Sequence, residues 1–197
     1  IQNNISDRFL IKEGKLNGWS IKFAGSTEEK KLKNQSFNKN LLTGCLTLLD
    51  LSVENISIEI DGALCEDGLN LIRVDGNIDN IEAKNVLSDA VDADFSELNI
   101  EKIKIINAGN DCFDVSSGDY YVNDAVMQNC NDKAVSVGEK SKIFINSAKI
   151  SNSNIGLAVK DSSIAKINTI NVNSTNICLN AFNKKQEFWG GKITLKS

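Results

Sequence analysis

The chain has 197 residues, a formal net charge of −4 and a sequence pI of about 5.0, which argues against nucleic acid and anionic membranes as partners. It has no histidine, which excludes a serine–histidine triad and removes the commonest metal ligand and general base. No stretch approaches the apolar length that crosses a bilayer, so we expect no membrane span, and the length fits a single domain over residues 1–197.

The first 40 residues predict an irregular first turn followed by a charged insertion. Phe9-Leu10-Ile11 is a short apolar run, and residues 19–23 alternate between apolar and polar. Residues 24–40 contain the run Glu28-Glu29-Lys30-Lys31-Leu32-Lys33. Such a run is typical of a solvated loop or short helix, or of a loop that binds a partner.

From residue 67 to residue 182 one short pattern returns every 22 residues. Each copy begins with a small residue, continues with a large apolar residue, and then alternates. The six copies are Gly68-Leu69-Asn70-Leu71, Ala90-Val91-Asp92-Ala93, Cys112-Phe113-Asp114-Val115, Ala134-Val135-Ser136-Val137, Gly156-Leu157-Ala158-Val159 and Cys178-Leu179-Asn180-Ala181. A fixed internal period of this length indicates a solenoid, in which each repeat buries its apolar face against its neighbours.

The alternation within each copy predicts a half-buried strand, and copies at a fixed period must run in parallel. A second short strand follows in each turn, as in Ile81-Glu82-Ala83 and Ile103-Lys104-Ile105, and Leu46-Thr47-Leu48 fits the template one turn earlier. A leucine-rich repeat needs regularly spaced leucines and a helical arm, and a left-handed coil needs hexapeptide periods. We therefore predict an all-β fold, a right-handed parallel β-helix with about 22 residues per turn.

Two polar columns accompany the turns. One contains only asparagine, and the other contains small polar residues. Stacked amides can hydrogen-bond along a column, so we assign both columns to the scaffold. Their members are Asn85, Asn107, Asn129 and Asn152, and Ser88, Asn110, Asp132, Asn154 and Asn176.

Residues 183–197 depart from the template and contain Phe188-Trp189-Gly190-Gly191. We expect this divergent last turn to cover the open end of the coil, because exposed strand edges invite association. Without a cap, we expect end-to-end or homo-oligomeric association, or further domains in the same chain. The chain begins at Ile1 and not at a methionine, so we expect either a mature form or a part of a longer protein.

The five cysteines form no CxxC pair. Cys112 and Cys178 share a column but lie three turns apart, roughly 14 Å at the usual strand spacing, which is too far for a bond. We therefore expect free thiols that behave as small apolar residues, and no disulfide scaffold. A bacterial extracellular or cell-surface location and a cytoplasmic one both stay open.

Charged side chains gather on the middle turns. Like charges stacked at strand spacing repel each other, by roughly 1 kcal/mol in water and by several when desolvated. Neutralising lysines, a raised pKa used for acid catalysis, or bound Ca²⁺ would relieve this repulsion; a solvated acidic face is the alternative. The columns are Asp67, Asp89, Asp111 and Lys133; Asp92 and Asp114; and Asp94 and Lys160, with Arg73 nearby. Asp67, Asp89 and Asp111 are the candidate Ca²⁺ ligands.

Four of these turns resemble the polygalacturonase signature, which places NTDG, GDDC, GHG and RIK on consecutive turns of a right-handed β-helix. The matching runs are Asp89-Ala90, Gly109-Asn110-Asp111-Cys112, the stretch 132–138, and Gly156-Leu157-Ala158-Val159-Lys160. The resemblance implies an inverting glycoside hydrolase with Asp89 and Asp111 as acid and base, and with Lys133 and Lys160 beside them. Asn110, Lys133 and Ala158 depart from the family pattern, which removes its histidine and its arginine.

These observations predict a domain that contacts a polysaccharide or oligosaccharide, with or without catalysis. The predicted catalytic residues are Asp89, Asp111, Lys133 and Lys160. The predicted binding residues are Asp92, Asp94, Asp114, Arg73, Tyr120 and Tyr121. The alternatives are a structural or assembly module of a larger bacterial surface or biosynthetic protein, and a degenerate glycoside hydrolase or lyase.

Overall fold

The computed structural model describes residues 8–27 and 37–196, and these residues form twelve strands and no helix. All twelve strands belong to one sheet in which every pairing is parallel. The strands are β1 (Phe9–Asn17), β2 (Ser20–Ala24), β3 (Gly44–Ala63), β4 (Asp67–Val86), β5 (Asp89–Asp94), β6 (Glu97–Ala108), β7 (Phe113–Ser116), β8 (Asp119–Gly138), β9 (Lys142–Lys160), β10 (Ile164–Asn173), β11 (Ile177–Phe182) and β12 (Lys192–Leu195).

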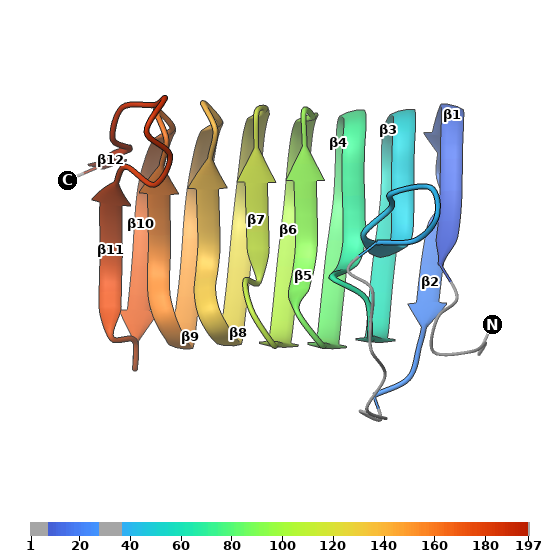
Figure 1. The fold of residues 1–197 in the computed structure, drawn as a ribbon, viewed down its shortest axis with the longest axis horizontal. Coiled ribbons are helices and arrows are strands. Elements are labelled where there is room, and N and C mark those ends of the chain that lie inside the picture. Colours follow the sequence, from blue (N-terminus) through green and yellow to red (C-terminus); the bar gives the residue numbers. More distant parts are fainter. Residues whose placement is uncertain (1–7, 28–36, 197) are drawn as a thin grey trace.

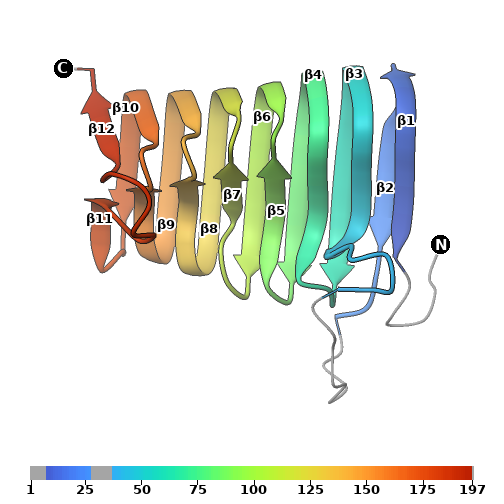
Figure 2. The ribbon, with the colours of Figure 1, turned by 45° about the horizontal axis from the view of Figure 1, so that its top comes forward.

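The chain winds as a right-handed parallel β-helix of about six turns, which confirms the predicted fold (Figure 1). Asp67 lies beside Asp89, and Asp92 beside Asp114, at the expected spacing of 22 residues. The spacing becomes 23 where Val126 lies beside Lys149, because the turn between them has one more residue. The long strands β3, β4, β8 and β9 bend around the coil without interruption (Figure 2).

Each turn has three faces, which we name in chain order. The first face consists of the stacked segments 44–49, 67–72, 89–94, 111–116, 133–138, 155–160 and 177–182. The second face consists of 75–79 and the segments beside it, including 97–101, 119–123 and 142–146. The third face follows, with 81–86, 103–108 and 125–130 among its segments.

The inward side chains of all three faces form one continuous core. Leu69, Val91 and Phe113 follow one another along the first face and are at most 1% exposed. Ile81, Ile103 and their neighbours supply the core from the third face. Burial of each such side chain contributes about 1.5–3 kcal/mol, so the stacked turns stabilise one another.

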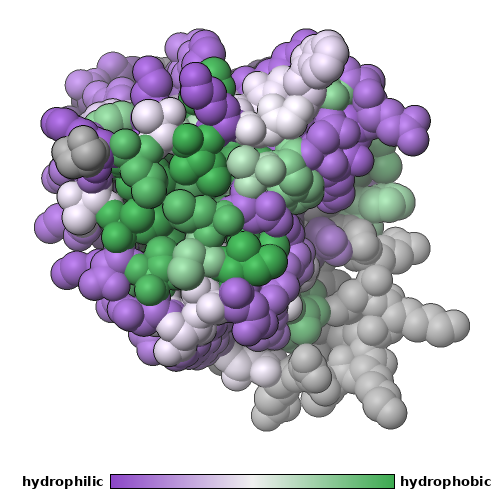
Figure 3. All heavy atoms as spheres, turned by 90° about the vertical axis from the view of Figure 1, so that its left-hand side faces the viewer, coloured by the Kyte–Doolittle hydropathy of each residue, from purple (hydrophilic) through white to green (hydrophobic). Residues whose placement is uncertain are grey.

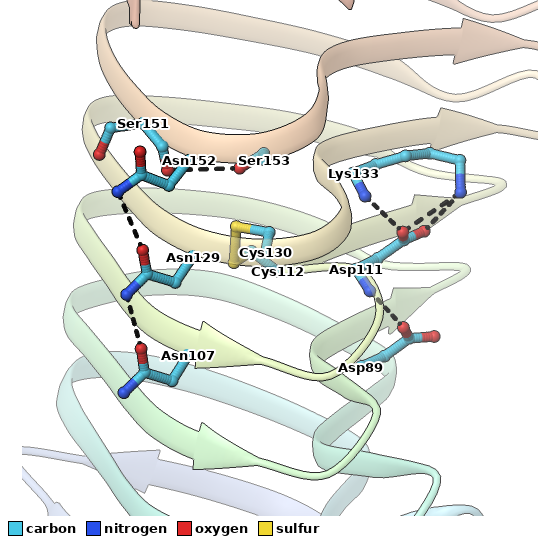
Figure 4. The surroundings of a disulfide bond; sticks show 10 residues. All are labelled: Asp89, Asn107, Asp111, Cys112, Asn129, Cys130, Lys133, Ser151, Asn152 and Ser153. Carbon is cyan, nitrogen blue, oxygen red and sulfur yellow. Dashed lines mark hydrogen bonds and ion pairs between the residues drawn. A yellow bond between two sulfur atoms is a disulfide. The ribbon is translucent and has the colours of Figure 1, made fainter. Parts of the chain in front are cut away.

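The asparagine column lies at a corner where the backbone is left-handed. Asn85, Asn107, Asn129 and Asn152 have φ values of 58°, 63°, 57° and 54°. Asparagine tolerates this conformation better than most residues. The amides of Asn107, Asn129 and Asn152 each donate to the amide oxygen one turn earlier at 2.8–3.1 Å (Figure 4), and the Asn85 amide donates to the Asp61 carboxylate at 3.2 Å. The predicted scaffold role of this column is confirmed.

The expectation of free thiols is wrong for four of the five cysteines. Cys45 bonds to Cys65 and Cys112 bonds to Cys130, each with a Cα–Cα distance of 5.4 Å, and Cys178 is free and exposed. Both pairs join the start of the first face to the end of the same turn, where Cys130 ends the third face and Cys65 lies in the connection between β3 and β4. Their separations of 20 and 18 residues fall just short of one turn, so the chain returns beside its own start.

The last turn leaves one end of the coil open. Trp189 is 85% exposed, so the predicted aromatic cover does not form at that residue. Apolar side chains gather in the middle of this end (Figure 3), where Ile170, Val172, Leu179 and Ile193 are only partly buried. Residues 28–36 of the predicted charged insertion lie outside the described residues. Across residues 8–27 and 37–196 no helix is long and apolar enough to cross a membrane.

Candidate functional site

The outer side of the first face carries three polar columns side by side, as predicted. The central column contains Asn70, Asp92, Asp114 and Ser136. The column before it contains Asp67, Asp89, Asp111 and Lys133, and the column after it contains Asp94, Ser116, Gly138 and Lys160. We call the side chains of these three columns the acidic groove.

The first column is a hydrogen-bonded ladder. The Asp89 carboxylate accepts from the Asp111 backbone N–H at 2.8 Å and from the Asn110 amide at 2.7 Å. The Asp111 carboxylate accepts from the Lys133 backbone N–H at 2.9 Å and from its ammonium at 3.2 Å (Figure 4). Each carboxylate therefore holds the backbone of the next turn in place. This structural role explains why an aspartate occurs at that position in successive turns.

Burial sets the protonation of this column. It raises the pKa of Asp67 to about 7 and that of Asp89 to about 6, because a charged carboxylate loses hydration there. Burial alone would lower the pKa of Lys133, but the neighbouring Asp132 and Asp111 carboxylates outweigh it and raise that pKa. The Lys133 side chain is 15% exposed, and its ammonium also contacts the Asp132 carboxylate directly. Lys133 thus lies close enough to Asp111 to neutralise its charge.

The central column holds the carboxyl groups with fewest partners. Asp92 accepts a hydrogen bond from the Asn70 amide at 3.0 Å. Lys160 donates to the Ser136 hydroxyl at 2.6 Å, and its ammonium lies 3.8 Å from Asp114 Oδ1. Within the described part of the chain, Asp114 Oδ1 meets no hydrogen-bond donor, and neither do Asn70 Oδ1, Asp67 Oδ2 and Thr47 Oγ1. Acceptors therefore outnumber donors on this face.

The pKa values of the central carboxyl groups move in one direction. Burial raises the pKa of Asp92 well above its usual range, and the charge of Asp94 adds to the effect. Burial followed by the charge of Asp114 raises the pKa of Asp94. Burial also raises the pKa of Asp114, against the opposing charge of Lys160. Several raised carboxyl pKa values in one groove mark a candidate functional site and allow a proton to be held near neutral pH.

The structure separates the remaining predicted binding residues from the groove. Arg73 lies at the corner after the first face and forms a bidentate pair with Asp50, at 2.6 and 3.1 Å. Tyr120 is buried and its hydroxyl donates to the Ala93 carbonyl at 2.8 Å, so it is a core residue and lies off the ligand-accessible surface. Tyr121 lies on the second face, where its ring stacks against Phe144.

Two groove residues were absent from the sequence prediction. Asn70 and Ser136 lie at the two ends of the central column and are at most 1% exposed. Both residues are polar, and the 22-residue repeat places them at the outward-facing position of the first strand. This combination is the sequence signal that could have identified them.

The candidate Ca²⁺ site gains no geometric support. Among residues 8–27 and 37–196, no three or more acidic or cysteine side chains are arranged to hold a metal ion. Asp89 and Asp111 direct carboxylate oxygens toward backbone N–H groups of the next turn. Bound Ca²⁺ at Asp67, Asp89 and Asp111 stays a prediction from the sequence.

No protein-family model, curated protein or solved structure matches the chain. The resemblance to polygalacturonases therefore rests on the residues of the four turns alone.

Proposed function

We propose that the acidic groove binds a glycan, with Asp92, Asp94 and Asp114 accepting hydrogen bonds from its hydroxyl or amino groups. The observation that carries this proposal is the excess of acceptors: among residues 8–27 and 37–196, buried side-chain oxygens of Asp114 and Asn70 meet no hydrogen-bond donor. A buried acceptor without a donor costs about 1–3 kcal/mol, and a donor-rich ligand would recover that energy. Stacked parallel strands also offer an extended surface suited to a polymer.

Charge favours an amino-sugar or neutral glycan over a uronate. Six aspartates stand on the three columns against Lys133 and Lys160. Although burial raises the pKa values of several of them, a ligand ammonium would favour their ionised forms, whereas a ligand carboxylate would raise these pKa values further. A ligand carboxylate about 4 Å from an ionised aspartate would be repelled by roughly 1 kcal/mol in water and by about 4 kcal/mol near a protein surface. The proposed ligand class thus differs from the acidic polymer that the polygalacturonase resemblance implies.

The hydrogen bonds favour binding without turnover. An inverting hydrolase needs a free carboxylic acid and a free carboxylate base with a water between the base and the sugar. Asp89 and Asp111, the predicted acid and base, already accept hydrogen bonds from the following turn. We propose positioning roles for both, and for Lys133 and Lys160, which fix the neighbouring carboxylates.

Calorimetric titration with three hexasaccharides tests the proposal: hexaglucosamine, cellohexaose and hexagalacturonate. We expect hexaglucosamine to bind most tightly and hexagalacturonate most weakly. Asp92→Asn and Asp114→Asn should each weaken hexaglucosamine binding at least about tenfold, because a charge-assisted hydrogen bond is worth about 1.5–3 kcal/mol. The matched control is Asp79→Asn, an exposed aspartate outside the groove. Preferred binding of hexagalacturonate, or wild-type affinity in both groove variants, would contradict the proposal.

A second candidate function is an assembly module, and the open end of the coil favours it. Ile170, Val172, Leu179 and Ile193 leave apolar surface uncovered there (Figure 3). Exposed apolar patches and strand edges promote association with another chain or domain. Sedimentation velocity over a range of protein concentrations tests this candidate, and a monomer at every concentration would count against self-association.

A further inference from the structure

We infer that the second face carries a separate site for a neutral sugar ring, built around Tyr121 and Phe144. The surface is hollowed there into a shallow pocket of about 680 Å³, whose lining includes these two rings and Asn99, Glu97, Asp119 and Lys142. This volume falls within the usual range for small-ligand sites, about 300–1,000 Å³. None of these residues belongs to the acidic groove.

The two rings give the pocket an apolar wall. Tyr121 and Phe144 lie side by side on adjacent turns, with ring centroids 5.1 Å apart and an angle of 12° between the rings. Tyr121 is exposed and Phe144 is partly buried, so part of each residue stays accessible to a ligand. Tyr121 is 41% exposed although it stacks on an aromatic neighbour.

Polar side chains surround this wall. Asn99 and Glu97 are exposed on the turn before Tyr121, and the Asn99 amide donates to Asn77 at 3.1 Å. Lys142 lies 3.5 Å from Asp119, and both side chains are more than half exposed. Hydrogen-bond donors and acceptors, both charged and neutral, are therefore available to the hydroxyl groups of a ligand.

The combination selects the class of ligand. A pyranose ring presents an apolar C–H face and a rim of hydroxyl groups, which matches an aromatic wall with amide, carboxylate and ammonium groups beside it. Asp75, Glu97 and Asp119 stand against Lys142 and Lys166, so the lining carries a formal charge of only −1. Asp119 already pairs with Lys142, and Asp75 accepts from the Glu97 backbone N–H, so the pocket offers little to an ionic ligand. A neutral hexose is thus the best match, in contrast to the amino sugar favoured by the acidic groove.

A purely structural reading makes a different prediction. Cross-strand aromatic pairs stabilise a sheet by about 0.2–1 kcal/mol, and Tyr121 and Phe144 would then affect stability alone. The inference rests on the proposed function only in the class of ligand, a glycan, and the two can be separated by variants on different faces.

The test is calorimetric titration of the full chain with cellohexaose and with mannohexaose. Tyr121→Ala and Phe144→Ala should each weaken binding of the better hexasaccharide at least about fivefold, the loss expected for one ring contact. Tyr121→Phe keeps the ring and should retain binding, which separates loss of contact from loss of fold. Phe95→Ala, which removes a 60% exposed ring at a corner of the coil, is the matched control.

The outcomes separate the two sites. Loss in Tyr121→Ala with wild-type affinity in Asp92→Asn supports the second-face site. Wild-type affinity in Tyr121→Ala and Phe144→Ala overturns it, and loss in Asp92→Asn would then assign the neutral glycan to the acidic groove. Binding of hexaglucosamine alone overturns the second-face site and leaves the proposed function standing, whereas no binding of any hexasaccharide overturns both.

Discussion

The buried carboxyl groups make the stability of the protein depend on pH, and Asp67 shows the size of the effect. Asp67 is 3% exposed, and burial raises its pKa from 3.8 to about 7. A carboxyl group whose pKa is higher in the folded state stabilises the protein when protonated. That stability is fully present below pH 3.8 and is lost as the pH rises through 7.

The magnitude follows from linkage. Between pH 5 and pH 8 the folded state releases a proton from Asp67 that the unfolded state has already lost, which costs roughly 3 kcal/mol of unfolding free energy. Asp89, with a pKa of about 6, changes in the same direction. Asp67→Asn carries no charge at either pH, so we expect it to stabilise the protein at pH 8 and to lose most of that advantage at pH 5.

Urea unfolding at pH 5 and at pH 8 measures both effects. Wild type should be less stable at pH 8, and Asp67→Asn should show a smaller difference between the two pH values. Asp79→Asn, the exposed control, should follow wild type. A wild-type stability that rises from pH 5 to pH 8, or an Asp67→Asn effect that is equal at both, would refute this reasoning.

Three further predictions concern the scaffold. Titration of thiols in the native protein should find one free thiol, at Cys178, and two or more reactive thiols in the unreduced protein would contradict the disulfide pairing. Replacing both Cys112 and Cys130 by alanine should lower the unfolding free energy by about 3 kcal/mol, the estimate for a disulfide that closes a loop of this length. Asn107→Val should be less stable than Asn107→Gly by about 1–3 kcal/mol in denaturant unfolding, because a β-branched residue is strained at a φ of 63°; equal stabilities would argue against a left-handed corner. Phe113→Ala should cost about 3–5 kcal/mol in the same assay, since the ring is 1% exposed, and a cost below 1 kcal/mol would place the ring outside the core.

The sequence predicted the coil well because each structural position of a turn recurs in every 22-residue repeat. A single alternation such as Val91-Asp92-Ala93 is a weak signal, but its return at 22 residues assigns inside and outside for every turn. The same register correctly placed Asp92 beside Asp114 and brought Lys160 near them.

The disulfide partners and the backbone hydrogen bonds of the aspartates could not be predicted, because they depend on how the chain bends at the corners between faces. Cys112 bonds to Cys130 across a corner, and a search for neighbours along a column passes over such a pair. Tyr120 and Tyr121 are a different case: they are adjacent on one strand, so its alternation, which the sequence prediction did not apply to them, sends one into the core and the other outward. The hydrogen bond from the Asp111 backbone to Asp89 likewise depends on how a turn closes, and it shifts the proposed ligand contacts from Asp89 to Asp92 and Asp114.

The most direct test of the acidic groove is carbon-13 NMR of the aspartate carboxyl groups, recorded with and without hexaglucosamine. We predict that the Asp92 and Asp114 carboxyl signals titrate with raised pKa values in the free protein, because burial disfavours their charged forms. Both signals should shift when the glycan is added, while that of Asp79 should stay unchanged. Ordinary titration of Asp92 and Asp114, together with no shift on adding the glycan, would contradict the account.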